Sequence, residues 1–337
     1  MTLKGDKMKA LVIGTGSVAR ANYLPVLAAQ EDIQLLYYNR TRSRASECSR
    51  LFGGTVYDSI EAAMEHTPDL IFVLTSETAR AEILRKMCRH KPQRLFLEKP
   101  LVAEAGQDHV SEDDFFIARE LMTEVSAANC ETAMIFNYRF FEQSQRAHRI
   151  IRTRSFGAVL NVTASTNYAC WSHVIDLMHF FVGPIEQVSA SAGRHIHSHG
   201  PGAAADIVAA LGFENGACGT LLGSWSLDFG FPLFDFSVNC EGGRVHMSGL
   251  DGELEVFDYG NGCRETYSIT HNSSRWDWYK ASFEKSITAY LKSIRTANPP
   301  PVPGKSGLEE LQVEAALRRS IREGRPVILE KEFPLVP

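Results

Sequence analysis

The sequence lacks the features of a membrane protein or a nucleic-acid-binding protein. It contains no apolar run of the roughly 20 residues that a membrane-spanning helix requires. No hydrophobic segment typical of a signal peptide precedes the first predicted strand, so we expect a cytoplasmic location. Positive charge is not in excess, because 35 lysines and arginines face 40 acidic residues and the net charge is -5. This balance argues against nucleic acid and against an anionic membrane surface as partners.

The cysteines are not arranged for disulfides or for a metal. There are seven of them, an odd number, scattered along the chain with no C-x-x-C pair. Both a disulfide framework and a structural zinc site depend on paired spacings. We therefore expect free thiols in a reducing compartment and no metal site. The remaining composition, 44% hydrophobic and 22% charged over 337 residues, is typical of a globular protein of about two domains.

A glycine-rich turn near the N-terminus is the most informative motif that is present. The apolar run 11–13 breaks into Gly14-Thr15-Gly16-Ser17-Val18-Ala19 and then reads as a helix. The first glycine allows a tight turn, and the second lets the backbone approach a pyrophosphate. The small third residue lets helix and strand pack closely, while the helix N-terminus offers free N–H groups. These six residues are predicted to bind a dinucleotide.

The first part of the chain alternates strand and helix patterns. This alternation predicts a doubly wound parallel sheet, hence a Rossmann domain over residues 1–136. The polar stretch 103–114 is predicted to be a surface insertion. The predicted strands are 9–13, 33–38, 70–74, 95–97 and 132–136, and the predicted helices are 19–29 (interrupted near residue 25), 41–52, 59–66, 79–89 and 115–128.

After residue 137 the pattern changes to an α+β domain that we place over 137–337. It predicts a large, open, mostly antiparallel sheet with helices on one face. The uncovered face predicts a homodimer or homotetramer. Helix 307–323 is expected to pack back on the first domain. The predicted strands are 159–166, 185–192, 204–213, 219–226, 234–240, 244–248, 253–259 and 265–269, with helices at 143–153, 171–182, 276–296 and 307–323.

The second predicted strand favours NADP over NAD. A carboxylate for the NAD ribose is expected about 20 residues after the glycine-rich turn, but the chain has Asn39 there, followed by Arg40. Asparagine does not repel a 2′-phosphate, and a guanidinium binds one in forked geometry. Arg42 and Arg44 either add to this site or only decorate a helix start.

Three further segments, in order, complete a resemblance. They are Leu97-Glu98-Lys99-Pro100, the stretch Phe136-Asn137-Tyr138-Arg139-Phe140, and a helix reading H-x-x-D from His173 to Asp176. Together with the glycine-rich turn they resemble the glucose–fructose oxidoreductase, inositol dehydrogenase and MocA (Gfo/Idh/MocA) family. The resemblance spans essentially the whole chain, including its proline-rich linker and C-terminal helix.

The resemblance implies residue roles. Lys99 matches the family's catalytic lysine and His173 its catalytic histidine. Lys99 and His173 would also contact the substrate and exchange its hydroxyl proton. Asp176 lies one turn beyond His173 and is expected to orient it or to tune its charge. The alternatives are an exposed lysine, a half-buried histidine and a helix-stabilising carboxylate. Because of their places at strand ends and the domain junction, Thr75, Ser76, Glu98, Lys99 and Asn137 are expected to contact the cofactor.

Two aromatics and one arginine complete the candidate substrate residues. Tyr168 and Trp171 flank His173, where they either face a sugar ring or belong to the core. Arg139 either pairs with an anionic group on the substrate or braces the junction between domains.

The chain departs from the family at Ala169, where many members carry an aspartate, and at Arg80, where histidine is common. Three hypotheses follow. The first is an NAD(P)-dependent oxidoreductase that transfers hydride to or from a sugar, cyclitol or related polyol. The second is a redox-assisted glycosidase or lyase that recycles its cofactor. The third is a nucleotide-binding sensor without catalysis.

Overall fold

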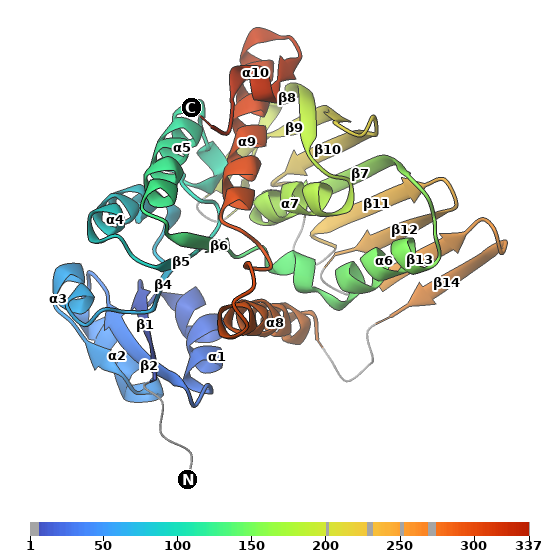
Figure 1. Ribbon diagram of the computed structural model, residues 1–337. Coiled ribbons are helices and arrows are strands. Elements are labelled where there is room, and N and C mark those ends of the chain that lie inside the picture. The colour runs from blue at the N-terminus through green and yellow to red at the C-terminus, as the bar shows by residue number, and fades with distance from the viewer. Residues whose placement is uncertain (1–6, 200–201, 228–231, 250–252, 269–273, 337) are drawn as a thin grey trace.

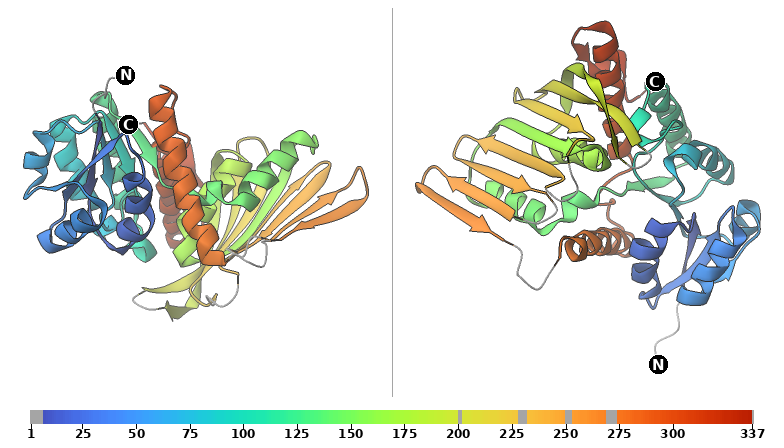
Figure 2. Two further views of the ribbon diagram at one scale, coloured as in Figure 1. Left: turned by 90° about the horizontal axis from the view of Figure 1, so that it is seen from below. Right: turned by 180° about the vertical axis from the view of Figure 1, so that it is seen from behind.

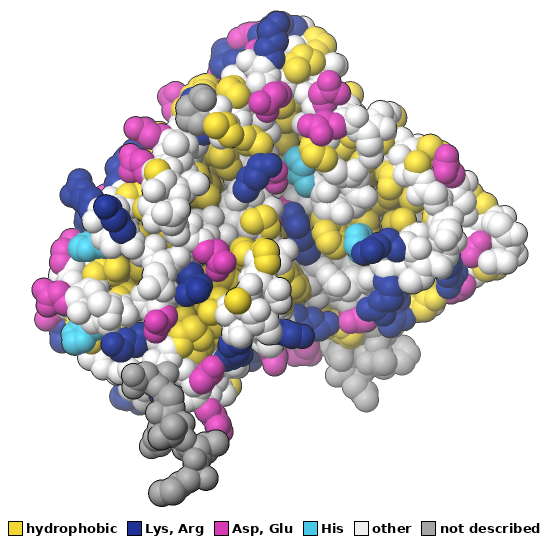
Figure 3. All heavy atoms as spheres, viewed as in Figure 1, with side chains coloured by type: hydrophobic (Ala, Val, Ile, Leu, Met, Phe, Trp, Pro, Cys, Tyr) yellow, Lys and Arg dark blue, Asp and Glu magenta, His cyan; other side chains and the backbone are white. Residues whose placement is uncertain are grey.

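The computed structural model describes residues 7–199, 202–227, 232–249, 253–268 and 274–336. Within these ranges the strands form two sheets, one six-stranded and one nine-stranded (Figure 1). No helix in the described part of the chain is long and apolar enough to cross a membrane. Basic and acidic side chains are interspersed over the face shown in Figure 3, so this face carries no extended surface of one charge.

The six-stranded sheet is entirely parallel, with strand order β3-β2-β1-β4-β5-β6. β1 pairs with β2 on one side and with β4 on the other, so the strand order reverses at β1. Ligands of doubly wound sheets bind at the carboxyl ends of the strands beside such a reversal. The predicted Rossmann fold is confirmed. Its strands are β1 (Met8–Ile13), β2 (Ile33–Tyr38), β3 (Thr55–Val56), β4 (Leu70–Val73), β5 (Arg94–Leu97) and β6 (Glu131–Met134).

Helices cover both faces of this sheet because successive side chains of a strand point to opposite sides. Leu11 and Ile13 of β1 belong to one apolar cluster, whereas Ala10 and Val12 belong to another. The predicted helix 19–29 is a π-helical turn followed by a short α-helix. Pro25 lies in the first turn of that α-helix, where its missing N–H does not break a helical hydrogen bond. The helices are η1 (Ala19–Tyr23), α1 (Leu24–Ala28), α2 (Arg42–Phe52), α3 (Ile60–Met64), α4 (Glu77–His90) and α5 (Glu112–Ala127).

The polar segment 103–114 is not a surface insertion along its whole length, so that prediction is wrong. Ala103, Val110 and Asp114 are buried. The Asp114 carboxylate accepts hydrogen bonds from the backbone N–H groups of Glu104 and Ser111, at 2.8 Å each, and these bonds compensate for its burial. The segment therefore has both buried and exposed residues, with Glu104, Ala105 and His109 exposed, and it passes through the 3-10 turn η2 (Gln107–His109) before α5 begins.

The nine-stranded sheet has the order β14-β13-β12-β11-β7-β10-β9-β8-β15, with one parallel pair, β7 and β10, near its middle. Helices α6 (Glu142–Thr153) and α7 (Trp171–Phe181) lie on one face, and no helix of the described residues covers the opposite, bare face (Figure 2). The predicted mostly antiparallel open sheet is thus confirmed. Residue 269, the end of a predicted strand, lies outside the described residues. The strands are β7 (Val159–Asn167), β8 (Ile185–His199), β9 (Gly202–Phe213), β10 (Cys218–Ser224), β11 (Phe234–Cys240), β12 (Gly243–Ser248), β13 (Glu253–Asp258), β14 (Cys263–Tyr267) and β15 (Val327–Ile328).

Helix α8 (Arg275–Arg295) returns to the first sheet and completes one of its cores. Phe283 packs edge-on against Tyr23 at 5.4 Å between ring centres, and Tyr290 lies 4.9 Å from Phe96. Arg295 pairs with Asp32 at 2.7 Å on the surface of the same contact. The chain after residue 137 therefore supplies part of the core of the first domain, so a single boundary in the sequence does not separate the two domains.

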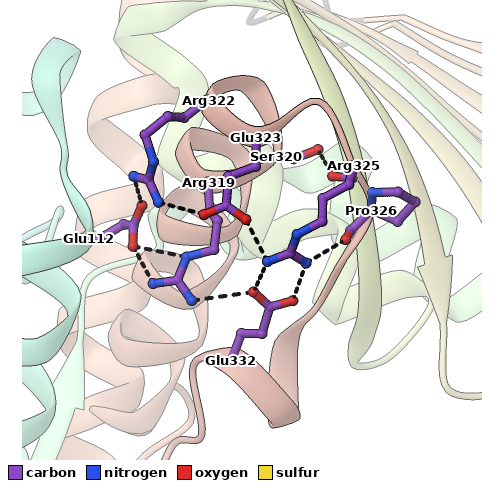
Figure 4. A network of polar contacts seen from close by, with 8 residues as sticks. All are labelled: Glu112, Arg319, Ser320, Arg322, Glu323, Arg325, Pro326 and Glu332. Atoms are coloured by element: carbon purple, nitrogen blue, oxygen red, sulfur yellow. Dashed lines mark hydrogen bonds and ion pairs between the residues drawn. The ribbon is translucent and has the colours of Figure 1, made fainter.

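Helix α9 (Lys305–Glu323) lies between α5 and β8 and joins the two domains. Glu112, at the start of α5, accepts hydrogen bonds from Arg319 and Arg322 of α9. Arg319 and Arg325 in turn both bind Glu332 of α10 (Leu329–Glu332), at 3.3 and 2.7 Å (Figure 4). A branched network of this kind holds three segments in one arrangement, which isolated surface ion pairs do not.

Candidate active site

The glycine-rich turn joins β1 to η1 where the strand order reverses. Gly14 has a φ of +97°, and a Cβ there would lie 2.8 Å from the backbone of Leu74 and Thr75. Only glycine fits, because the end of β4 presses directly against the turn. A Cβ on Gly16 would meet nothing within 4 Å, so the backbone at the second glycine faces open space. The turn thus offers the close backbone approach that a pyrophosphate requires.

A cleft of about 290 Å³ extends from this turn to the junction of the two domains. The cleft brings together most of the predicted cofactor residues with Lys99 and His173. It is lined by Gly16, Ser17, Val18, Ala19, Leu74, Thr75, Ser76, Glu77, Arg80, Glu98, Lys99, Gln107, Ile135, Asn137, His173, Tyr279 and Phe283.

The cleft wall fits a nicotinamide dinucleotide. Thr75 Oγ1 and Asn137 Oδ1 are buried and have no hydrogen-bond partner among the described residues. Each such atom costs about 1–3 kcal/mol when it is left without a partner. The amide and ribose hydroxyl groups of a nicotinamide nucleotide would supply those partners. No group of three or more His, Cys, Asp or Glu side chains in the described ranges is placed to hold a metal ion.

Lys99 lies in the segment that follows β5, and its peptide bond to Pro100 is cis. Its backbone N–H donates to Glu98 Oε2 at 2.9 Å, while Glu98 Oε1 accepts from the Tyr23 hydroxyl at 2.7 Å. Its Nζ donates to Gln107 Oε1 at 3.3 Å and to the Ala169 carbonyl at 3.5 Å. The ammonium is therefore held over the cleft by neutral acceptors and, among the described residues, makes no ion pair.

His173 occupies the first turn of α7 and is buried against the cleft. Its ring stacks on Tyr138, with 4.1 Å between centres and 9° between planes, and meets Phe136 edge-on. Burial, together with the positive charge of Lys99, holds the pKa of His173 well below its ordinary value. The imidazole is therefore neutral at physiological pH and able to accept a proton.

Asp176 does not orient His173, so that prediction is wrong. Both of its carboxylate oxygens bind Arg139, at 2.7 Å to Nε and 2.6 Å to Nη2. The Nδ1 atom of His173 has no hydrogen-bond partner among the described residues. Burial raises the pKa of Asp176 to about 6, although the Arg139 guanidinium opposes the shift. Asp176 instead fixes Arg139, so the arginine braces the junction rather than facing the cleft.

The two candidate aromatics lie in the core beside the cleft. Tyr168 donates from its hydroxyl to the Ala205 carbonyl at 2.6 Å, and its ring meets Trp171 at 5.3 Å between centres. Both side chains are buried, and neither lines the cleft. Their contact with a substrate therefore remains a prediction that depends on movement of this region.

At the ribose end, the Asn39 side chain is engaged on both sides. Its Oδ1 accepts from the Thr15 backbone at 3.0 Å and its Nδ2 donates to the Thr41 carbonyl at 2.9 Å. Arg40 is exposed, Arg42 pairs with Asp58, and Arg44 lines a second hollow beside the glycine-rich turn. Asn39 thus holds the turn, and Arg40 and Arg44 are the cations with freedom to meet a phosphate.

Sequence reasoning missed several groups at this site. Gln107 lies in the segment 103–114 that was predicted to be a surface insertion, and α8 brings Tyr279 and Phe283 to the cleft from far along the chain. Glu310 and Glu314 of α9 are fully buried, and their carboxylate oxygens have no hydrogen-bond partners of ordinary geometry in the described structure. The sequence shows only that the two acids are four residues apart, and so on one side of the predicted helix 307–323.

Comparison with known proteins agrees with the fold and the motifs. Residues 8–112 match the model of an oxidoreductase family with an NAD-binding Rossmann fold, and residues 166–246 match the Gfo/Idh/MocA C-terminal domain. A myo-inositol 2-dehydrogenase from Thermotoga maritima is 22% identical over 305 residues, covering 81% of this chain and 84% of that protein.

Solved structures share the fold at low identity. An oxidoreductase from Agrobacterium radiobacter in complex with NAD+, L-tartaric acid and magnesium has a TM-score of 0.80 at 16% identity, covering 96% of this chain and 99% of that one. A levoglucosan dehydrogenase in complex with NADH and L-sorbose has a TM-score of 0.78 at 15% identity, with the same coverage. Because both family models match in the order of the two domains, the chain belongs to the Gfo/Idh/MocA family and is an oxidoreductase with an NAD-binding Rossmann fold.

Proposed function

We propose that this oxidoreductase transfers a hydride between NADP(H) and a CH–OH carbon of a sugar, cyclitol or related polyol. The observation that carries the proposal is one cleft shared by the glycine-rich turn, Lys99 and His173. The substrate class is supported by the names of two similar proteins, a myo-inositol dehydrogenase and a levoglucosan dehydrogenase.

In this proposal two side chains handle the hydroxyl proton. The nicotinamide supplies the hydride acceptor when it is bound. His173, kept neutral by burial, accepts the proton as the hydride leaves the carbon. Among the described residues Lys99 Nζ has two acceptors, both neutral, at 3.3 and 3.5 Å, so the ammonium can turn a donor toward the developing alkoxide. In the reverse direction the same groups return the proton to the carbonyl oxygen.

A panel of sugars and polyols, offered with NADP+ and NAD+ and monitored by nicotinamide absorbance, tests the proposal. We expect reduction of the cofactor with at least one polyol. Release of an aglycone with no net absorbance change would instead favour the cofactor-recycling glycosidase or lyase that Ala169 suggests. Tight cofactor binding by calorimetry with no turnover on any substrate would favour a sensor.

The preference for NADP rests on the cations beyond β2. We expect Arg40→Ala to weaken NADPH binding about tenfold and Arg44→Ala to weaken it less, because each loses a charge-assisted bond to the 2′-phosphate. NADH binding should stay nearly constant in both variants. Arg42→Ala is the matched control, since Arg42 is already paired with Asp58. Fluorescence titration with both nucleotides measures these affinities, and tighter binding of NADH by the unaltered protein would contradict the preference.

We also propose that the protein forms a homodimer or homotetramer through the bare face of the nine-stranded sheet. Val208 of β9 is 50% exposed and lies opposite Leu222 of β10 in the ladder. Apolar residues on an uncovered sheet face favour contact with a second copy. We expect Val208→Glu to reduce the molar mass measured by light scattering to that of one chain. Val336→Glu, at an exposed site near the C-terminus, should leave the mass unchanged.

A further inference from the structure

Arg80 carries a full positive charge in the interior, and nothing in the proton transfer described above uses it. It lies in the first turn of α4, is 2% exposed and lines the cleft. Burial of a guanidinium is unfavourable unless hydrogen bonds compensate for the lost water. The burial of this arginine beside the cleft therefore needs a structural or functional explanation.

The contacts of Arg80 are concentrated on the backbone around Lys99. Its Nη2 donates to the Thr75 carbonyl at 2.7 Å, where β4 has ended. Its Nη1 donates to the Glu98 carbonyl at 2.7 Å and also to the Pro100 carbonyl. One guanidinium thus binds the residue before Lys99 and the residue after it, and ties both to the neighbouring strand end.

The charge of Arg80 is matched locally. The carboxylates of Glu98 and Glu77 favour its charged form against the desolvation that burial imposes. Glu98 is itself held by the Tyr23 hydroxyl and by the Lys99 backbone, at 2.7 and 2.9 Å. The guanidinium and this carboxylate therefore clamp the Lys99 segment from two sides.

We propose that Arg80 is a positioning residue for Lys99, whose backbone it holds so that the ammonium stays over the cleft. The inference rests on the proposed role of Lys99 in proton transfer. Lysine in place of Arg80 would keep a cation but has one nitrogen, which cannot span three carbonyls in fixed geometry. Displacement of a catalytic group by about 1 Å costs about 10²-fold in rate.

The test is a double-mutant cycle between Arg80→Lys and Lys99→Ala. We expect Arg80→Lys to lower kcat about 10²-fold while the dissociation constant for NADPH changes less than about threefold. In the Lys99→Ala background the same substitution should have almost no further effect, because a group that acts through Lys99 has nothing left to position. Arg85→Lys, at an exposed site on the same helix, is the control and should have no effect on kcat.

Rescue provides a second measurement. We expect Arg80→Ala to lose activity and millimolar guanidinium to restore part of kcat without changing the melting temperature. The inference would be overturned if Arg80→Lys lowered kcat by its full factor in the Lys99→Ala background as well. It would also be overturned if the loss of activity in both Arg80 variants matched the fraction of protein that is unfolded. If Lys99→Ala alone retains full activity, the proposed function fails. If Lys99→Ala loses activity but Arg80→Lys retains it in full, the positioning role of Arg80 fails and the proposed function stands.

Discussion

Lys99→Ala is expected to lower kcat by about 10²- to 10⁴-fold while NADPH still binds with nearly its original affinity. Lys99 Nζ is held over the cleft by two neutral acceptors, so the alanine variant loses the donor that would stabilise the developing alkoxide. The glycine-rich turn and the strand ends that hold the cofactor are unchanged. Initial rates on the best substrate, together with fluorescence titration of the nucleotide, measure the two effects separately.

Two comparisons make this result specific. Lys99→Arg retains the charge but is a poor proton donor, so we expect it to bind substrate and to turn over slowly. Lys9→Ala removes a lysine outside the cleft, on β1, and should leave kcat unchanged. Near-complete activity of Lys99→Ala would refute the assignment of this lysine to the proton transfer.

Glu314→Gln is expected to stabilise the folded protein by about 3 kcal/mol at pH 8 and by less than about 1 kcal/mol at pH 5. Burial raises the pKa of Glu314 to about 7, and the Arg318 guanidinium, at 3.8 Å, only partly offsets the shift. The folded protein therefore holds this proton more tightly than the unfolded chain. Stability falls as the pH rises from the ordinary value of 4.5 through 7, and glutamine, which has no charge to lose, removes this dependence.

The measurement is the difference between variant and unaltered protein in urea unfolding at each pH. The pH dependence of stability in the unaltered protein is not sufficient by itself. Burial lowers the pKa of His173 and His179, and these two residues therefore destabilise the fold at low pH, which is opposite to the effect of Glu314. Glu330→Gln, on the exposed side of α10, is the control and should change stability by less than about 0.5 kcal/mol. A difference that does not grow with pH would show that the pKa of Glu314 is not raised in the fold.

Glu310 shares this environment, and burial together with the neighbouring Glu314 carboxylate raises its pKa well above the ordinary value. The groups around Glu310 are Glu314 on its own helix, Ser172 and Asp176 on α7, and Lys99 across the cleft. Glu310→Gln should therefore remove part of the same pH dependence. Measurement of both variants shows how the proton is divided between the two carboxyls.

Much of the local chemistry of this protein could be predicted from its amino-acid order. The glycine-rich motif indicated a tight turn at Gly14, although the Leu74 and Thr75 backbone that leaves no room for a Cβ there was not visible in the sequence. The order of Glu98, Lys99 and His173 along the chain was enough to indicate the family. Short apolar runs alternating with helical patterns determined the Rossmann sheet, because the periodicity of burial is a local property. Asn39 at the end of β2 was likewise visible, although its bonds to Thr15 and Thr41 were not.

Which of these groups contact one another could not be predicted, because it depends on how the chain packs in three dimensions. Asp176 lies on the same helix as His173, one turn away, yet its carboxylate binds Arg139, because a buried guanidinium offers two donors and the imidazole at most one. Arg80 reaches the backbone on both sides of Lys99, and α8 reaches the first sheet from far along the chain. Contacts of this kind depend on how helices pack against a sheet. The spacing of apolar residues along a helix or strand does not specify that packing.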